Sequence, residues 1–330
     1  MKVAFFIHSL EVNSCRYRVL QFLPYLQERG VEASIHFYPR GWKDRMILYR
    51  TLGSHDIFYI HRRLFHPIEF WALRHRARKI IYDFDDAIMY RSSGSKHPHS
   101  LSRRMKFAFM MKRVDVVIAG NQFLKGEALR YNPNVEVVPT SIDLSHYAVK
   151  ENYRPEGPLT IGWLGSGSTL KYLKSVMPAL ENLYERFPQF RLKVVCDRFV
   201  DSDRLPVIKK AWSSEGEQSD LRSFDIGIMP LADDLWSKGK CGFKILQYYG
   251  VGVPAICTPV GVNQDLVEHG VNGFWARNEH EWISHLFTLM QEETLRKEMG
   301  LRGRKAVETN YSVEVNAPRI LQVLKRVSAR

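Results

Sequence analysis

Short apolar runs alternate with stretches of helical periodicity along the whole chain. In the first half, a helical pattern over Arg16–Arg29 predicts a helix that Gly30 closes and that Pro24 kinks or shortens. The alternation of strands and helices predicts parallel sheets covered by helices. The apolar runs of this half that predict buried strands are Val3–Ile7, Ala33–Phe37, Ile57–Ile60, Lys79–Asp83, Val114–Ala119 and Val135–Val138.

A polar segment interrupts this rhythm near the middle of the chain. Residues Val149–Pro158 include two prolines and a glycine, a composition typical of a linker. We therefore predict two doubly wound α/β domains, residues 1–150 and 151–312, facing each other across a central cleft. After the linker the pattern predicts strands at Leu159–Leu164, Leu192–Cys196, Ile226–Met229 and Pro254–Cys257, and helices at Lys171–Arg186 and Val313–Val327.

The composition is that of a soluble globular protein. Of the 330 residues, 45% are hydrophobic and 25% are charged. The four cysteines form no CxxC pair, which argues against a disulfide framework or a structural zinc site and fits a reducing compartment. No apolar run approaches the ~18 residues of a membrane span. The expectation is a cytoplasmic protein, either soluble or peripheral to the inner face of the membrane.

The net charge of +13 is concentrated in the first half. Residues 1–150 contain 24 Lys and Arg against 13 Asp and Glu, whereas the remainder is close to neutral. This asymmetry indicates an anionic partner for the first half, which phosphate, anionic lipid or nucleic acid could each provide. Within His99–Arg113 a basic amphipathic helix suits an anionic membrane surface. The alternative is a helix packed on a sheet with its basic face in solvent. The apolar line predicted for this helix comprises Leu101, Met105, Ala108 and Phe109.

A glycine- and serine-rich turn follows the first strand of the second half. Glycines let the backbone approach a ligand closely, and the free N–H groups of the following helix start bind anions. The alternative is a purely structural strand-to-helix turn. The residues predicted to form this anion site are Gly165, Ser166, Gly167, Ser168 and Thr169.

A second and stronger signal lies in Asp233–Pro259, where three lysines surround two glycines before a helix that begins near Phe243. Lys240 and Lys244 are four residues apart, so a helical or near-helical turn would place both ammonium groups on one side. Together with the amide of Gly242 and the helix dipole, they would neutralise a diphosphate leaving group. The alternative is a basic helix start in solvent.

These motifs resemble those of the group 1 glycosyltransferases, which are retaining enzymes of GT-B fold with nucleotide-sugar donors. The resemblance rests on GWLGSGST, FDIGIMPLADDLWSKGKCGFKILQYYGVGVPAI and TPVGVNQDLVEHGVNGF. It implies that the second domain binds the donor and that the C-terminal helix, 313–330, crosses back to the first. Many members carry two glutamates where this chain has Gly239 and Gln247. In those members the second glutamate binds the ribose of the nucleotide, and Gln247 can form hydrogen bonds with the ribose hydroxyls in its place. Trp212 lies where the family places the nucleotide base, although a core tryptophan is an equal alternative.

The resemblance also places residues of the first half at the acceptor side. Asn13, Arg16 and Arg18 follow the first strand, in a loop that would hold the acceptor or the donor phosphates. The alternative for the two arginines is a position on a helix face without contact to a ligand. Three carboxylates follow another strand, and one of them would orient an acceptor hydroxyl or the reacting sugar. We expect no metal and no cofactor. The alternative for these carboxylates is a capping and salt-bridging cluster. They are Asp83, Asp85 and Asp86.

The resulting hypothesis is transfer of a sugar from a nucleoside-diphosphate donor to a glycan or lipid-linked acceptor, in the synthesis of a cell-surface polysaccharide or glycolipid. A non-hydrolysing nucleotide-sugar epimerase would share the fold, but the sequence offers no clear pair of acid and base groups. A nucleic-acid-binding or DNA-modifying protein would account for the basic first half. A non-catalytic nucleotide-sugar-binding protein would account for the two missing glutamates.

Overall fold

The computed structural model describes residues 1–155 and 157–329 and divides the chain into two compact units. The first unit contains Met1–Ser141, Asp234–Cys241 and the chain from Val313 onwards. The second contains Ile142–Asp233 and Gly242–Ser312. The C-terminal helix therefore belongs to the first unit, as expected. The predicted boundary after residue 150 lies a few residues beyond Ser141, and the assignment of 234–241 to the first unit was not predicted.

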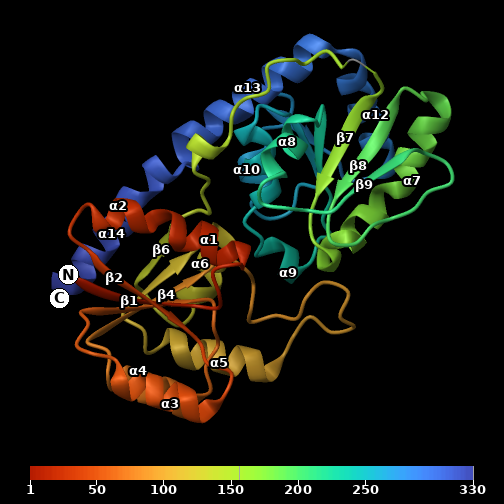
Figure 1. Ribbon diagram of the computed structural model, residues 1–330. Helices are drawn as coiled ribbons and strands as arrows, with labels where there is room; N and C mark the ends of the chain where they lie inside the picture. The colour runs from red at the N-terminus through yellow and green to blue at the C-terminus, as the bar shows by residue number, and fades with distance from the viewer. Residues whose placement is uncertain (156, 330) are drawn as a thin grey trace. The chain divides into compact units, whose positions relative to one another are not determined.

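The first unit is built on a six-stranded parallel sheet in the order β2-β1-β3-β4-β5-β6 (Figure 1). Its central strands are almost entirely buried, which explains why they are continuous apolar runs in the sequence. Each strand predicted in this half is present, with small changes at its ends. The strands are β1 (Lys2–Ile7), β2 (Glu32–Phe37), β3 (Ile57–His61), β4 (Lys79–Phe84), β5 (Val116–Ala119) and β6 (Val135–Val137).

Helices cover both faces of this sheet. One face packs against α3 (Trp42–Thr51), α4 (Pro67–Arg74), α5 (Leu101–Met111) and α6 (Gln122–Leu129), which contribute Tyr49, Phe70, Phe107 and Leu124 to the core. The other face packs against the segment from Asn13 to Gln27 and against α14 (Val313–Ala329). The first unit also contains α9 (Leu235–Lys238).

The single helix predicted over Arg16–Arg29 is wrong. The chain forms α1 (Asn13–Arg18), η1 (Leu20–Phe22) and α2 (Leu23–Gln27) instead. The break occurs at Val19, whose φ of −129° is not helical. Pro24 lies in the first turn of α2, where its missing N–H is tolerated.

The apolar line predicted for α5 is not the line of residues that faces the sheet. Phe107, Met110 and Met111 are the residues of this helix that enter the core, whereas Leu101 and Met105 are exposed. Ser100 caps the helix through a side-chain hydrogen bond from the Arg103 amide. Both lines of residues have helical spacing, so periodicity could not decide which of them faces the sheet.

The second unit is built on a second six-stranded parallel sheet, in the order β12-β11-β10-β7-β8-β9. Two of its strands were not predicted. β9 is an edge strand with mostly exposed residues, and β12 has only three residues. The strands are β7 (Leu159–Leu164), β8 (Phe190–Val195), β9 (Val207–Lys210), β10 (Ile226–Met229), β11 (Ala255–Cys257) and β12 (Gly273–Trp275).

Helices also enclose the second sheet, and α7 and α12 pack on its core. Within the part of the chain that the structure describes, no helix has the length and apolar character needed to cross a membrane. The helices of this unit are η2 (Leu144–His146), η3 (Gly167–Thr169), α7 (Leu170–Arg186), α8 (Glu217–Arg222), α10 (Phe243–Gly250), α11 (Asn263–Leu266), α12 (Glu279–Gln291) and α13 (Glu293–Asn310).

Candidate functional site

The strand order of the second sheet indicates at which end of its strands a ligand would bind. The chain proceeds outward from β7 through β8 to β9 and then returns to the other side of β7 with β10. In open parallel sheets, ligands bind outside the carboxyl ends of the strands at such a switch point. In this unit that edge carries the turn Gly165–Thr169, which follows β7.

The glycine- and serine-rich turn is held together by its own hydrogen bonds. The Ser166 amide donates to Thr169 Oγ1 (3.1 Å), and the Thr169 amide donates to the Ser166 carbonyl (2.8 Å). The Gly167 amide donates to Asp197 Oδ1 (2.6 Å), and this bond lowers the pKa of Asp197. Because these three amides already have partners, the prediction that they form a free anion site is not supported.

Trp163 connects this turn to the start of α10. A Cβ on Gly165 would overlap the Trp163 ring, so only glycine fits there. Lys244, in the first turn of α10, has its Nζ 5.0 Å from the centroid of the same ring. The Lys244 ammonium and the Gly165 turn, both predicted to bind the donor, are thus held near one aromatic side chain.

Lys240 does not share a helical turn with Lys244, and that prediction is wrong. α10 begins after Gly242, whose left-handed φ of +63° ends the preceding segment. Lys240 lies in the segment assigned to the first unit, where Asn121 donates to its carbonyl oxygen (3.0 Å). Its Nζ is 4.0 Å from Asp86 Oδ1.

Gln247 is the most unusual side chain of the second unit. It is fully buried in α10, and neither its amide oxygen nor its amide nitrogen has a hydrogen-bond partner among the described residues. A buried amide without partners costs about 1–3 kcal/mol, and such groups are rare in native proteins unless a ligand or an ordered water satisfies them. Helical side chains lean toward the N-terminus of their helix. Gln247 therefore leans toward the turn that contains Phe243 and Lys244.

Trp212 lies in the loop between β9 and α8. It is partly buried, and its Nε1 donates to Glu217 Oε2 (2.9 Å). Glu217 in turn accepts a hydrogen bond from the Tyr147 hydroxyl (3.2 Å). This anchoring provides a structural reason for the tryptophan, and stacking on a nucleotide base stays a prediction.

The first unit has its own switch point between β1 and β3, and a buried polar network lies nearby. Asp83 at the end of β4 accepts hydrogen bonds from Arg18 Nε (3.2 Å) and from His61 Nδ1 (3.0 Å), and Arg18 also donates to the Val138 carbonyl (2.7 Å). Burial alone would raise the pKa of Asp83, but Arg18 and His61 more than offset it and hold the pKa below its ordinary value. Arg18 and Asp83 are thus partners of each other, and their polar side-chain atoms are occupied by contacts within the protein.

His61 is a candidate that the sequence analysis missed. Its Nδ1–H, held by Asp83, leaves Nε2 as a hydrogen-bond acceptor, and Nε2 is buried without a partner in the described part of the chain. The available signal was its place at the carboxyl end of a predicted strand. Nothing local distinguishes it from a core histidine, because its partner Asp83 is 22 positions away.

The other two carboxylates form a second network in the first unit. Arg62 contacts Asp86 and lies 3.6 Å from Asp85 Oδ1. Its left-handed φ of +58° is uncommon for a residue with a side chain and indicates local strain. Burial raises the pKa of Asp86, although Arg62 and Lys240 act in the opposite direction. In the described residues no group of three His, Cys, Asp or Glu side chains is placed to hold a metal.

The remaining acceptor-side candidates lie on α1. Asn13 is the exposed first residue of this helix. Arg16 is partly buried, with its guanidinium 5.3 Å from the centroid of the Tyr17 ring. Their predicted contact with an acceptor or a phosphate stays a prediction.

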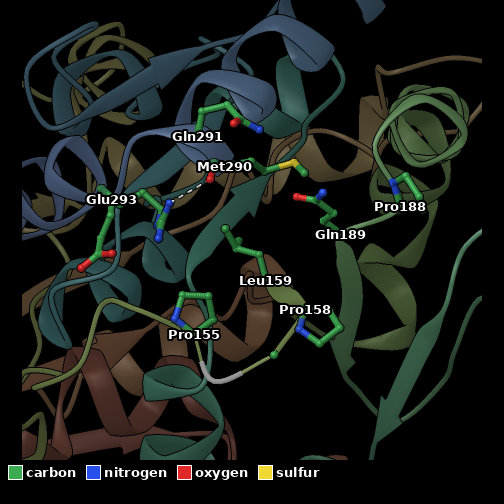
Figure 2. Close-up of a pocket in the computed structure, with 10 residues that line it drawn as sticks. Pro155, Pro158, Leu159, Pro188, Gln189, Met290, Gln291 and Glu293 are labelled. Carbon is green, nitrogen blue, oxygen red and sulfur yellow. Dashed lines mark hydrogen bonds between the residues drawn. The ribbon is translucent and has the colours of Figure 1, made fainter.

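A cavity of about 520 Å³ lies at the opposite edge of the second sheet, by the amino ends of β7 and β8 (Figure 2). Its charged lining residue Arg296 donates to the carbonyl oxygens of Leu289 (2.7 Å), Met290 (3.1 Å) and Tyr153 (3.0 Å). The Arg296 guanidinium is therefore occupied by carbonyl groups, two of them at the C-terminal end of α12, which gives this residue a structural role. The cavity lies at the amino ends of the strands, whereas the strand order predicts ligand binding at their carboxyl ends.

Known proteins resemble this chain in part of its sequence and in its fold. Residues 159–292 match the family described as glycosyl transferases group 1. No curated protein matches the sequence. A sucrose-phosphate synthase from Thermosynechococcus elongatus is similar in structure, with a TM-score of 0.75 at 13% identity, covering 100% of this chain and 99% of that one.

Two further structures are similar over nearly the whole chain. HepE from Anabaena, in complex with UDP and glucose, has a TM-score of 0.75 at 15% identity and coverage of 98% and 99%. A glycosyltransferase from Rickettsia africae has a TM-score of 0.75 at 13% identity and coverage of 99% and 98%. The chain therefore has the GT-B fold.

Proposed function

We propose that this protein is a glycosyltransferase that moves a sugar from a nucleoside-diphosphate donor to a hydroxyl group of an acceptor. The second unit would bind the donor. The match of residues 159–292 to the group 1 glycosyltransferases supports this assignment. HepE, which has the same fold, is in complex with UDP and glucose, so uridine diphosphate is the first nucleotide to test.

The observation that carries the proposal is the unpartnered amide of Gln247. A ribose presents two neighbouring hydroxyl groups, each of which can donate and accept a hydrogen bond. The oxygen of Gln247 would accept from one hydroxyl and its nitrogen would donate to the other. A glutamate, usual at this position in the family that the sequence resembles, could only accept when ionised. The neutral amide therefore suits ribose without adding a negative charge near the diphosphate.

Lys244 would stabilise the leaving group. As the bond between the sugar C1 and the diphosphate oxygen breaks, negative charge grows on the diphosphate. Lys244 lies in the first turn of α10, where the helix dipole also favours an anion. The acceptor oxygen forms the new bond to C1, and its proton leaves with the diphosphate or with the solvent. Retention of anomeric configuration is the outcome that the sequence resemblance favours.

The first unit would bind the acceptor, for which a glycan and a lipid-linked sugar are the two classes we propose. His61 Nε2 would accept a hydrogen bond from an acceptor hydroxyl. Asp83 would keep the imidazole in the tautomer that leaves Nε2 unprotonated, and Arg18 would keep Asp83 in place. This assigns Arg18 and Asp83 positioning roles in place of the direct contacts predicted from the sequence.

Thermal stabilisation by nucleotides tests the donor site. A ligand at one hundred times its Kd stabilises a protein by about 2.7 kcal/mol, which raises Tm by about 5 °C or more. We expect UDP to do this for the wild type, and Gln247→Leu to remove most of the rise while keeping the volume of the side chain. Gln291→Leu, in the same unit at an exposed position, is the matched control.

Two results would contradict the proposal. In the first, none of UDP, GDP, dTDP and ADP raises the Tm of the wild type. In the second, UDP raises the Tm of Gln247→Leu as much as it raises that of Gln291→Leu. Release of UDP from a UDP-sugar only in the presence of an acceptor then separates a transferase from a protein that merely binds nucleotide-sugars.

A further inference from the structure

Three neighbouring helices of the first unit carry large apolar side chains on their outer surfaces. α3, α4 and α5 lie side by side on one face of the first sheet (Figure 1). Their inner residues fill the core, so the outer ones are not needed to hold the helices in place. The outer apolar residues, between 45% and 77% exposed, are Trp42, Ile47, Ile68, Trp71, Leu101 and Met105. We call this surface the three-helix face.

Side-chain contacts join the three helices to one another. Trp71 of α4 lies 6.4 Å from Phe109 of α5 between ring centroids, and Arg113 lies over both rings at 5.6 and 3.9 Å. Below the surface, Glu69 of α4 accepts a hydrogen bond from Tyr49 of α3 (3.0 Å) and contacts Arg45 (2.6 Å). The three helices that carry the exposed apolar groups are therefore packed as one layer, in which Trp71 joins α4 to α5.

The charge around these apolar groups is strongly one-sided. Residues 40–115 contain 17 Lys and Arg but only seven Asp and Glu, and of those seven Asp44 alone is exposed. The other carboxylates are at least partly buried, and most pair with basic residues of the same unit, as Asp83 does with Arg18. Exposed cations on or beside the three helices are Lys43, Arg50, Arg76, Arg78, Arg103 and Lys112.

We propose that the three-helix face binds the surface of an anionic lipid bilayer. Exposed apolar side chains of this size gain free energy by entering the boundary between headgroups and acyl chains, and tryptophan favours that boundary. The surrounding lysines and arginines complement anionic headgroups, and their long stems let the charge stay at headgroup level. A nucleic acid would pair with the cations but would leave side chains such as Ile68 and Leu101 in water.

This inference changes the membrane hypothesis drawn from the sequence. The sequence assigned the contact to residues 99–113 alone and to an apolar line that includes Ala108 and Phe109. In the structure the surface extends over three helices. α5 contributes Leu101, Met105 and Arg103, and Lys112 follows directly after this helix. The inference does not depend on the donor site. If the proposed function holds, it brings the acceptor-binding unit to the layer that would contain a lipid-linked acceptor.

Vesicle co-sedimentation of the full chain tests the charge requirement. We expect binding to vesicles of phosphatidylcholine mixed with phosphatidylglycerol and much weaker binding to phosphatidylcholine alone. Arg103→Gln/Lys112→Gln should weaken binding about fivefold for each cation removed. The matched control is Arg319→Gln/Lys325→Gln, which removes two exposed cations from α14 on the opposite face of the same sheet and should bind as the wild type does.

A second pair of variants tests the apolar requirement. Ile68→Ser and Leu101→Ser change side chains that are mostly in water, so folding should be unaffected, and each should weaken binding to the mixed vesicles several-fold. Leu301→Ser, at an exposed position of α13, is the control. Nucleotide-induced stabilisation, measured without vesicles, should be unchanged in all these variants, so failure here is distinguishable from failure of the proposed function.

Three results would overturn the inference. The first is equal binding to charged and uncharged vesicles. The second is a loss of vesicle binding in Arg319→Gln/Lys325→Gln as large as that in Arg103→Gln/Lys112→Gln. The third is salt-sensitive binding to duplex DNA without binding to vesicles. The last result would assign the basic surface to a nucleic acid.

Discussion

Asp83→Asn should destabilise the first unit strongly, because the substitution leaves the Arg18 guanidinium charged, buried and without a counter-ion. The Arg18 side chain is 1% exposed and Asp83 is fully buried. Removing one partner of a buried ion pair costs about 3–5 kcal/mol, a large fraction of the about 5–15 kcal/mol that separates a folded domain from its unfolded state. The asparagine oxygen can still accept from His61, so most of the loss is attributable to Arg18.

Hydrogen exchange measured by mass spectrometry suits a chain with two units, since it reports the opening free energy of each segment separately. The amides of β3 and β4 in Asp83→Asn should lose about two to three and a half orders of magnitude of protection. Asp44→Asn is the matched control in the same unit. Asp44 lies at an exposed position in the first turn of α3, where removing a surface charge costs about 0–1 kcal/mol.

A second variant identifies the cause of the destabilisation. Arg18→Met/Asp83→Asn removes the buried charge altogether and should recover most of the protection, because an apolar side chain of similar length replaces the guanidinium. Protection in Asp83→Asn that stays within about tenfold of the wild type would refute the reasoning. So would a double variant that is less protected than Asp83→Asn.

The same group determines a pH dependence. The pKa of Asp83 is lowered in the folded protein, so its contribution to stability is complete above the ordinary aspartate range and is lost as the pH falls through and below that range. The first unit of the wild type should therefore lose stability in acid more steeply than that of Asp83→Asn. Parallel acid-unfolding curves would contradict the assigned direction of the shift.

Two further predictions concern the candidate site. Lys244→Met should weaken UDP binding by about tenfold or more in calorimetric titration, the expected loss for a charge-assisted contact, while Lys297→Met on α13 should leave it unchanged. In His61→Asn, the amide nitrogen of the new side chain can take the position of Nδ1 and keep the hydrogen bond to Asp83. In His61→Gln, the longer side chain can place a polar atom near the position of Nε2. If Nε2 contacts the acceptor, His61→Gln should retain a lower acceptor KM than His61→Asn. A purely structural histidine would give the opposite order in acceptor KM.

The strands and their sheets were predictable because local patterns carry the information. β7 and β10 have the bounds that their apolar runs predicted, since a strand buried on both faces of a sheet must be apolar throughout. β9 was missed because its residues are mostly exposed, and β12 because three residues are too few for any pattern.

The candidate site was less predictable because its contacts are distant in sequence or depend on one backbone angle. The bond between Arg18 and Asp83 joins residues 65 positions apart, and no local spacing reveals it. Lys240 and Lys244 have the spacing of one helical turn, but the left-handed Gly242 between them starts the helix after Lys240. Gln247 was identified by resemblance, and its unpartnered amide is visible only in three dimensions.

The position of α14 has a consequence for folding during translation. The face of the first sheet that carries Phe5, Ile57 and Ile81 is completed by Ile320 and Leu324, which are synthesised only after the whole of the second unit. The strands of the first unit emerge early but must keep one apolar face uncovered during translation of the entire second unit. Folding in order of synthesis would thus finish the second unit before the first. Deletion of α14 alone should therefore expose one apolar face of the first sheet, whose strands precede the second unit in the sequence.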